Sequence, residues 1–402
     1  MKSLSPRPLP RIVLEPVKLL TSAAELALLR EAYSRRGAPA IRRKLANALA
    51  RRADWDAVIA LLNGTPDLST DECLLLAAAW LDLPSSDRCT QAAQLIEQVL
   101  VAGEAYLISK ALVLRATIET RNGNVAAARV SLKEALEIDP GNRAACMRLG
   151  SIALRAGDVD AALAMVDTLV RRGIGHAYLP AIRALAQGLS GDIAGARATI
   201  AADQLGFSAF VAPPPGWSDG AEFNAALARE LKAHTDLRRQ RYGASPVESW
   251  GIDKPLTPDA PLLHQLMKQI AAEIETRLAA LANADHSWLD HRPATATLHC
   301  SCVMTEAEDF EDWHVHPTGW LNGVYYVEIP EAVVNGSDSA GCIGFGLPES
   351  LAGSAAAAAY GVTTIRPSNG LMVAFPSHTY HRTFMHGCEG RRIAVTFELR
   401  SA

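Results

Sequence analysis

The chain has 402 residues, of which 49% are hydrophobic and 20% are charged, and its formal net charge is −4. This length allows two or three domains with cores of their own, and this composition is typical of a soluble globular protein. No basic run indicates nucleic acid or an anionic membrane, and no stretch approaches the roughly 18 apolar residues of a membrane span. The seven cysteines are scattered without a CxxC pair, so we expect reduced thiols and a cytoplasmic protein.

Three matching phrases in the N-terminal half are spaced by 34 residues, and their glycines are Gly123, Gly157 and Gly191. This period, with helical patterning on both sides of a glycine turn, resembles the tetratricopeptide repeat. Weaker copies lie at residues 51–58 and around Ala92. About five helical hairpins are therefore expected between residues 24 and 205, after an N-terminal extension of residues 1–23.

Small residues recur where the two helices of each repeat would cross closely. They are Ala116, Gly150 and Ala184 on the first helices, and Ala128, Ala162 and Ala196 on the second. Stacked hairpins of this kind form a concave groove, which would bind a peptide or a partner protein. The alternative is a scaffold or a dimerisation surface that touches no substrate, and only the dimerisation surface would make the protein a homodimer.

The second half of the chain changes its patterning. The run from Pro213 to Trp217 breaks the helical pattern, so residues 206–220 are expected to be a linker before a domain at 221–402. An amphipathic helix of about twenty residues is predicted from apolar residues at helical spacing. These are Leu263, Met267, Ile270, Ile274, Leu278 and Leu281. From Ala294 onward, short strands without long helices between them predict an antiparallel barrel or double-sheet jelly roll. The expected fold class is α+β, a helical solenoid followed by this jelly roll.

The stretch with the clearest chemistry contains His314 and His316, just ahead of a predicted strand. Side chains of an extended strand repeat every two residues, so both imidazoles can reach one metal ion. His381 follows a second apolar strand, and Arg392 begins a third. In a jelly roll these places can meet at the mouth of the barrel. Imidazole suits iron, zinc or copper, and three ligands leave coordination positions open for substrates.

In this region the chain resembles the catalytic domain of 2-oxoglutarate-dependent iron(II) oxygenases of the prolyl-hydroxylase-like group. It is most similar to the bacterial branch that carries tetratricopeptide repeats in front. The resemblance covers about residues 215 to 400 and rests on several motifs in order. These motifs are residues 313–330, 341–349, 365–384 and 391–399.

The resemblance implies a role for individual residues. His314 matches the first metal ligand and His381 the distal one. Arg392 matches the arginine that binds the far carboxylate of 2-oxoglutarate, while Thr396 matches an assisting hydroxyl and Tyr326 a tyrosine that reaches the same carboxylate. The residue types suit these roles, because a guanidinium offers a planar fork for a bidentate carboxylate contact.

Two assignments stay open at the level of sequence. His316 stands where the wider family carries an aspartate or glutamate. It either binds the metal, which gives a three-histidine site with one more positive charge, or lies behind a water ligand. Alternatively, Glu311 or Asp312 supplies the missing carboxylate. Arg391 can also exchange roles with its neighbour Arg392.

The resemblance implies that the cofactors are Fe(II) and 2-oxoglutarate and that O2 is a cosubstrate. The expected reaction hydroxylates a C–H bond of a peptide, protein or amino-acid-like substrate and converts 2-oxoglutarate to succinate. One alternative is a three-histidine iron dioxygenase that does not use 2-oxoglutarate, although Arg392 and Thr396 would then have no acid to bind. The other alternative is a non-catalytic repeat scaffold with a degenerate barrel.

Overall fold

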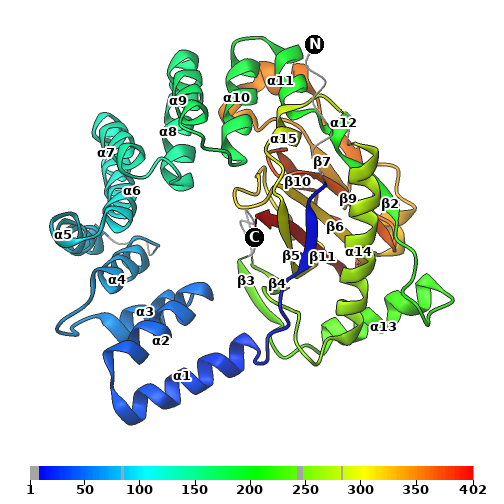
Figure 1. Ribbon diagram of the computed structural model, residues 1–402, viewed down its shortest axis with the longest axis horizontal. Coiled ribbons are helices and arrows are strands. Elements are labelled where there is room, and N and C mark those ends of the chain that lie inside the picture. Colours follow the sequence, from blue (N-terminus) through cyan, green and yellow to red (C-terminus); the bar gives the residue numbers. More distant parts are fainter. Residues whose placement is uncertain (1–8, 83–85, 242–247, 282–283, 402) are drawn as a thin grey trace. The chain divides into compact units, whose positions relative to one another are not determined.

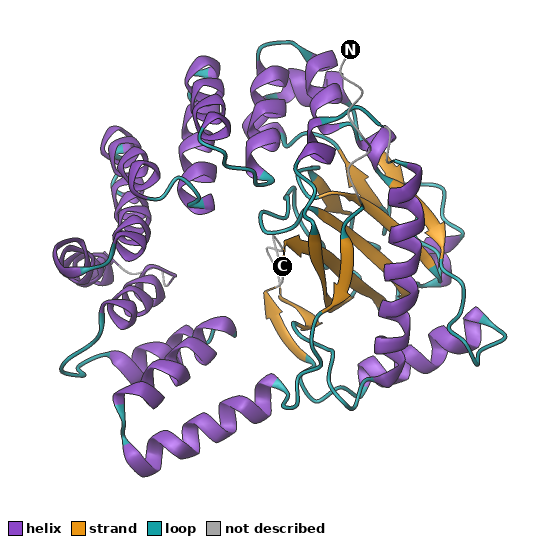
Figure 2. Cartoon of the chain, in the orientation of Figure 1, coloured by secondary structure: helices purple, strands orange, loops and turns teal. Residues whose placement is uncertain are grey.

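The computed structural model describes residues 9–82, 86–241, 248–281 and 284–401 (Figures 1 and 2). The chain forms two compact units, Ser22–Ile174 and a second unit that combines Met1–Thr21 with Gly175–Ala402. The described part of the first unit is helical, and the second holds both β-sheets. The predicted α+β class, with helical repeats before a jelly roll, is confirmed.

The first unit is a series of helices joined by short turns. They are α1 (Ser22–Arg36), α2 (Pro39–Arg51), α3 (Trp55–Leu62), α4 (Thr70–Asp82), α5 (Ser86–Ala102), α6 (Ala105–Arg121), α7 (Val125–Ile138), α8 (Arg143–Arg155) and α9 (Val159–Arg171). Alanines at the predicted crossings are fully buried, including Ala116, Ala128 and Ala162. Their small side chains let the paired helices approach closely.

The repeated phrase is a helix stop followed by a helix start. Gly123, Gly157 and Gly191 have φ angles of +75°, +70° and +87°. Glycine adopts this left-handed region without steric cost, and it ends the preceding helix. The next residue is asparagine or aspartate in each phrase, and its side chain accepts a hydrogen bond from the backbone N–H three residues later, at 3.2, 3.2 and 2.8 Å. The 34-residue period therefore arises because the same pair of helix caps, a glycine stop and a polar start, recurs in each phrase.

The weaker copy upstream uses the same turn without a glycine. Ala53 occupies the glycine position with a φ of +52°, and Asp54 caps α3 by accepting a hydrogen bond from the Ala57 N–H at 3.4 Å. Left-handed backbone is costly for alanine, so this copy has a poorer turn residue than the later ones.

The second unit contains a large and a small sheet. The large one has the strand order β2-β9-β6-β11-β5-β4-β3, with β1 added alongside β5, and the small one has the order β10-β7-β8. The large-sheet strands are β1 (Arg11–Leu14), β2 (Phe207–Phe210), β3 (Arg238–Arg241), β4 (Glu248–Ile252), β5 (Thr295–Thr305), β6 (Leu321–Glu328), β9 (Leu371–Pro376) and β11 (Arg392–Ser401). The small-sheet strands are β7 (Ile343–Phe345), β8 (Thr363–Ile365) and β10 (His381–Thr383).

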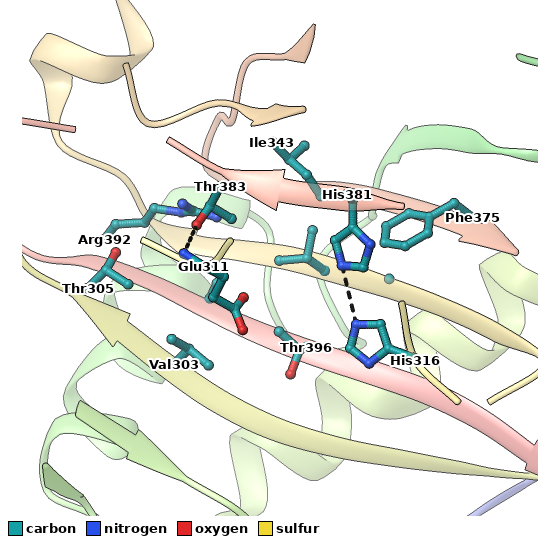
Figure 3. Close-up of a pocket in the computed structure, with 13 residues that line it drawn as sticks. Val303, Thr305, Glu311, His316, Ile343, Phe375, His381, Thr383, Arg392 and Thr396 are labelled. Carbon is teal, nitrogen blue, oxygen red and sulfur yellow. Dashed lines mark hydrogen bonds between the residues drawn. The ribbon is translucent and has the colours of Figure 1, made fainter. Parts of the chain in front are cut away.

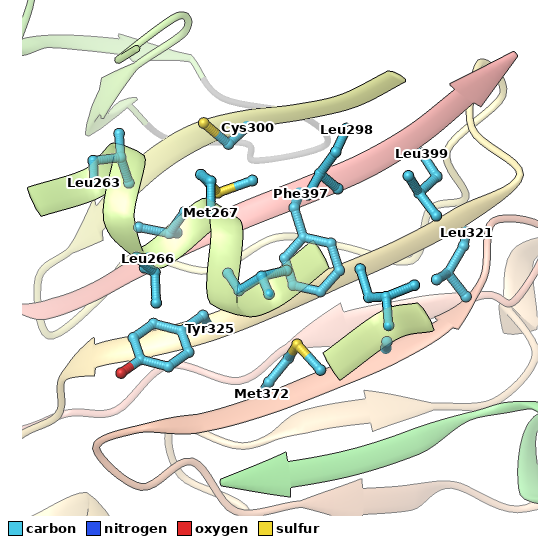
Figure 4. Close-up of a cluster of buried hydrophobic side chains, with 14 of the residues drawn as sticks. Leu263, Leu266, Met267, Leu298, Cys300, Leu321, Tyr325, Met372, Phe397 and Leu399 are labelled. Atoms are coloured by element: carbon cyan, nitrogen blue, oxygen red, sulfur yellow. The ribbon is translucent and has the colours of Figure 1, made fainter. Parts of the chain in front are cut away.

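Helices of this unit are mostly short. They are α10 (Tyr178–Leu189), α11 (Ile193–Ile200), α12 (Ala202–Leu205), α13 (Gly220–Lys232), α14 (Pro261–Ala280), α15 (Ser287–Asp290), α16 (Glu331–Val334), α17 (Glu349–Ala352) and α18 (Ser354–Tyr360). The predicted amphipathic helix is α14, whose apolar face packs across the large sheet (Figure 4). In the described part of the chain, no helix is both long and apolar enough to cross a membrane.

Two short strands lie in segments that were expected to be outside the domains. Within the expected linker, β2 pairs antiparallel with β9, and within the expected N-terminal extension, β1 pairs in parallel with β5. Both are four-residue runs of mostly apolar side chains, too short to stand out in the sequence. They become strands because an edge of the large sheet offers each of them free backbone groups.

The opposite face of the large sheet packs against the small sheet. A second apolar cluster lies between them, with Val324 and Tyr326 from β6, Phe375 from β9 and Phe345 from β7. Along β11 the side chains alternate, so that Ile393 and Val395 join the core beneath α14 while Arg392, Ala394 and Thr396 face a pocket between the sheets. This alternation places the polar residues of β11 inside the jelly roll.

Candidate metal centre

A pocket of about 590 Å³, counted to its open mouth, lies between the two sheets (Figure 3). Its apolar lining includes Val303, Val324, Ile343, Phe375 and Ala394. Its polar lining comprises Thr305, Glu311, His316, His381, Thr383, Arg392 and Thr396. Five of the residues named in the sequence analysis are among these, namely Glu311, His316, His381, Arg392 and Thr396, although they come from three separate parts of the chain.

Backbone hydrogen bonds join the two histidine-bearing segments. The His314 N–H donates to the His381 carbonyl at 3.0 Å, and the His381 N–H donates to the His314 carbonyl at 3.1 Å. The His316 N–H donates to the carbonyl of Ser377, the residue that follows β9, at 3.0 Å. These hydrogen bonds thus fix the position of the His-x-His segment relative to the segment that carries His381.

The three imidazoles converge. Their ring centroids are separated by 4.2 Å for His314 and His381, and by 5.1 Å for His316 and each of the other two. One ring nitrogen from each lies within 4.8 Å of the others. The Nε2 atoms of His316 and His381 are 3.3 Å apart. The described residues therefore offer three nitrogen ligands around one point, a donor set that suits a divalent transition metal.

The outer ring nitrogens are held by backbone carbonyls. His314 Nδ1 lies 2.7 Å from the Asp312 carbonyl oxygen, and His381 Nδ1 lies 3.0 Å from the Thr379 carbonyl oxygen. A carbonyl only accepts, so each Nδ1 carries the proton and each Nε2 keeps its lone pair. Hydrogen bonds of this kind orient the metal-binding histidines of many proteins.

Burial keeps two of the imidazoles uncharged. It lowers the pKa of His316 and of His381 well below the ordinary value of 6.5, and the neighbouring His314 lowers both further. A neutral imidazole is the form that binds a metal.

Arg392 lies in the pocket, and no acid among the described residues is within ion-pair distance of it. Its side chain is buried, and its Nε has no hydrogen-bond partner among the described residues. Its guanidinium lies 5.3 Å from the centre of the Tyr326 ring. Arg391 instead pairs with Glu306 at 2.9 Å and lies over the Trp250 ring, outside the pocket. Of the two candidate arginines, the structure places only Arg392 in the pocket lining.

Thr396 and Tyr326 have different positions. The Thr396 hydroxyl lines the pocket and lies 2.7 Å from the Ser301 hydroxyl. Tyr326 is fully buried beside the pocket, and burial raises the pKa of its phenol, while Arg392 opposes that shift. Its hydroxyl has no hydrogen-bond partner within the described residues. Unpaired buried polar atoms on Tyr326 and Arg392 fit a polar ligand between the sheets.

The two acids considered as substitutes for His316 are separated. Asp312 is exposed, and its carboxylate accepts a hydrogen bond from the N–H of Trp313. Glu311 lines the pocket, with Oε1 4.0 Å from His314 Nε2. Glu311 is not one of the three residues whose ligand atoms converge.

Sequence reasoning missed the threonines of the pocket, Thr305 and Thr383. Thr305 ends β5 opposite Arg392, and Thr383 lies two residues beyond His381 on β10. The strand alternation that starts from His381 and Arg392 was the available signal, because it places residues at i+2 and directly opposite on the same face.

Two regions of the chain match known protein families. Residues 300–398 match the family described as "Putative 2OG-Fe(II) oxygenase", and residues 120–188 match the tetratricopeptide repeat. The chain thus combines a region that matches the tetratricopeptide repeat with a region that matches the 2OG-Fe(II) oxygenase family model. Iron(II) and 2-oxoglutarate are the cofactors of that family, so this prediction is confirmed, and the histidine cluster can hold the metal.

No curated protein matches the chain. Among solved structures, it is similar to a prolyl-4-hydroxylase of Pseudomonas putida, with 15% identity over 53% of this chain and 99% of that chain and a TM-score of 0.33. It is similar to a tetratricopeptide repeat protein of Parabacteroides merdae, with 16% identity, coverage of 45% and 71%, and a TM-score of 0.35. HygX of Streptomyces hygroscopicus, solved with nickel and 2-oxoglutarate, has 11% identity, coverage of 50% and 85%, and a TM-score of 0.33.

Proposed function

We propose that the protein is an Fe(II)- and 2-oxoglutarate-dependent dioxygenase that hydroxylates a C–H bond of a peptide, protein or amino-acid-like substrate. One observation carries this proposal. A single pocket has converging imidazoles at one end and, at the other, an arginine that forms no ion pair with any described residue. A dicarboxylic acid that chelates a metal through one end and binds a guanidinium through the other matches this arrangement.

His314, His316 and His381 are assigned to the iron. All three offer a ring nitrogen toward the same point, and His314 and His381 have that nitrogen freed by a backbone contact on the other side of the ring. Three ligands leave positions for the cosubstrate and for O2, which a closed structural site would not.

Arg392 is assigned to the far carboxylate of 2-oxoglutarate, with Thr396 and Tyr326 beside it. Burying a guanidinium without a partner is costly, so an anionic ligand stabilises this side chain as much as the arginine stabilises the ligand. The contact of Arg391 with Glu306 supports the choice of Arg392, because Arg391 is already paired.

Bound iron(II) supplies the activation of O2, with 2-oxoglutarate as the reductant that leaves as succinate and carbon dioxide. The chain holds and orients these groups and keeps water away. Apolar side chains such as Val324, Ile343 and Phe375 form much of the pocket wall between its two polar ends. Neutral imidazoles keep the metal-binding nitrogens free of protons at neutral pH.

The repeats favour a peptide or protein as the substrate. Helical repeats of this kind present extended surfaces to partner chains. The substrate would therefore be recognised in part by residues remote from the iron.

Anaerobic calorimetry together with visible absorption spectroscopy tests this function. We expect 2-oxoglutarate to bind the Fe(II)-loaded protein with a visible charge-transfer band, and His381→Ala to abolish both the metal binding and the band. Succinate should then form when O2 is admitted with a substrate peptide. Iron binding without any binding of 2-oxoglutarate would instead support the three-histidine dioxygenase, and absence of iron binding would support the scaffold.

A further inference from the structure

We propose that Glu311 is a positioning residue that supplies, from beside the ligand set, the negative charge that the three histidines lack. This inference rests on the proposed function, because it requires a divalent metal at the histidine cluster. The neighbouring carboxylate would then compensate the charge of the site without being one of the three converging ligands.

The backbone of Glu311 is fixed to the strand that carries His381. Its N–H donates to the Thr383 hydroxyl at 2.8 Å, and its carbonyl accepts a hydrogen bond from the Thr383 N–H at 3.0 Å. Thr383 lies two residues beyond His381 on β10. Glu311 and a metal ligand are therefore held by the same short strand.

The side chain of Glu311 points into the pocket. Figure 3 shows it between Arg392 and the pair of His316 and His381. Its side chain is only 16% exposed, and Oε1 lies 4.0 Å from His314 Nε2. Among the residues that the structure describes, no lysine or arginine forms an ion pair with it. A half-buried carboxylate without a basic partner is costly unless a cation lies nearby.

The charges of the pocket balance only when Glu311 is counted. Three neutral imidazoles add no charge to a divalent ion, and Arg392 adds one positive charge. Glu311 removes one, which leaves two positive charges for the two carboxylates of 2-oxoglutarate. A pocket without this carboxylate would keep one positive charge unbalanced in a poorly solvated site. Glu311 thus supplies, from a position beside His314, the negative charge that the three-histidine ligand set lacks.

The test measures Fe(II) binding by anaerobic calorimetry in the full chain. Glu311→Gln keeps the shape and removes the charge, and we expect about tenfold weaker iron binding, as for other residues behind metal ligands. Glu311→Asp should bind within about threefold of the unmodified protein, since it keeps the charge. Glu308→Gln is the matched control, because Glu308 is an exposed acid on the same segment, and its binding should not change.

The Glu311→Gln substitution made in the His316→Asp protein separates an effect of charge on iron binding from an effect on structure. His316→Asp puts a negative charge into the ligand set and halves the net charge of the metal site, so adding Glu311→Gln should then weaken iron binding only about threefold. An equal tenfold loss in both backgrounds would overturn the proposal, as would unchanged iron binding by Glu311→Gln with an unchanged unfolding temperature. Failure of the unmodified protein to bind iron would overturn the proposed function and this inference together.

Discussion

Trp288 and Trp320 are joined by two reciprocal hydrogen bonds. The indole N–H of Trp288 donates to the Trp320 carbonyl at 2.8 Å, and the indole N–H of Trp320 donates to the Trp288 carbonyl at 3.1 Å. The two rings stack at a centroid separation of 4.1 Å. Trp320 immediately precedes β6 and follows the His-x-His turn. The pair therefore connects α15 to the segment that carries two of the three histidines.

Trp288→Ala should destabilise the second unit. It removes a large buried ring and one of the two N–H groups that donate to the Trp320 carbonyl, the other being that of Ser377, which should lower the free energy of unfolding by about 3 to 5 kcal/mol. Trp288→Phe should cost less, about 1 to 3 kcal/mol, because it keeps most of the ring. Urea denaturation followed by circular dichroism measures both values. Equal losses in the two variants would contradict a contribution of the stacked ring beyond that of the indole N–H.

Arg392→Ala should weaken the binding of 2-oxoglutarate. Loss of one partner from a buried charge pair costs about 2 kcal/mol or more, which corresponds to a dissociation constant raised by about thirtyfold or more. Anaerobic calorimetry on the iron-loaded protein measures this constant. Arg391→Ala is the control, and its binding should stay within about threefold because its ion pair with Glu306 is partly exposed. A larger effect from Arg391→Ala would reverse the assignment of the two arginines.

The metal-free protein should lose stability as the pH falls below about 6.5, through residues that include His378. Burial, and then the neighbouring His286, lower the pKa of His378 from 6.5 to about 4. Between these values the unfolded chain binds the proton and the folded chain does not, so acid favours unfolding. The contribution of this histidine is present above pH 6.5, and about 3 kcal/mol is lost by the time the pH reaches its folded pKa.

Urea denaturation at about pH 7 and about pH 5 measures this slope. His378→Gln should flatten it by about 2 kcal/mol over that interval, whereas His291→Gln, at an exposed position, should leave it unchanged. His316 and His381 act in the same direction, so part of the slope should remain. An identical slope in His378→Gln and the unmodified protein would contradict the prediction.

The turns of the repeats give a matched pair of substitutions. Gly157→Ala meets no atom within 4 Å, so its cost should be backbone strain alone, about 1 to 2 kcal/mol. Ala53→Gly relieves the same strain but adds chain entropy to the unfolded state, so it should stabilise by less than about 1 kcal/mol. Thermal unfolding of both variants tests the two signs. Stabilisation by Gly157→Ala would show that the positive φ is not maintained in solution.

The sequence by itself determined the features that depend on neighbouring residues. Helix caps and turn glycines act within a few positions, so the period of Gly123, Gly157 and Gly191 predicted the helical hairpins. The spacing of apolar residues similarly predicted α14, and the His-x-His phrase predicted two imidazoles on one side of an extended segment.

Only the tertiary structure decided how distant segments meet. The bridge between His314 and His381 joins residues far apart in the chain, and β1 and β2 are strands only because a sheet edge accepts them. The choice of Arg392 over Arg391 depends on which face of β11 turns toward the small sheet. Pairing across a sheet depends on register and burial, and those are set by the whole core, whereas capping and periodicity are set by a few adjacent residues.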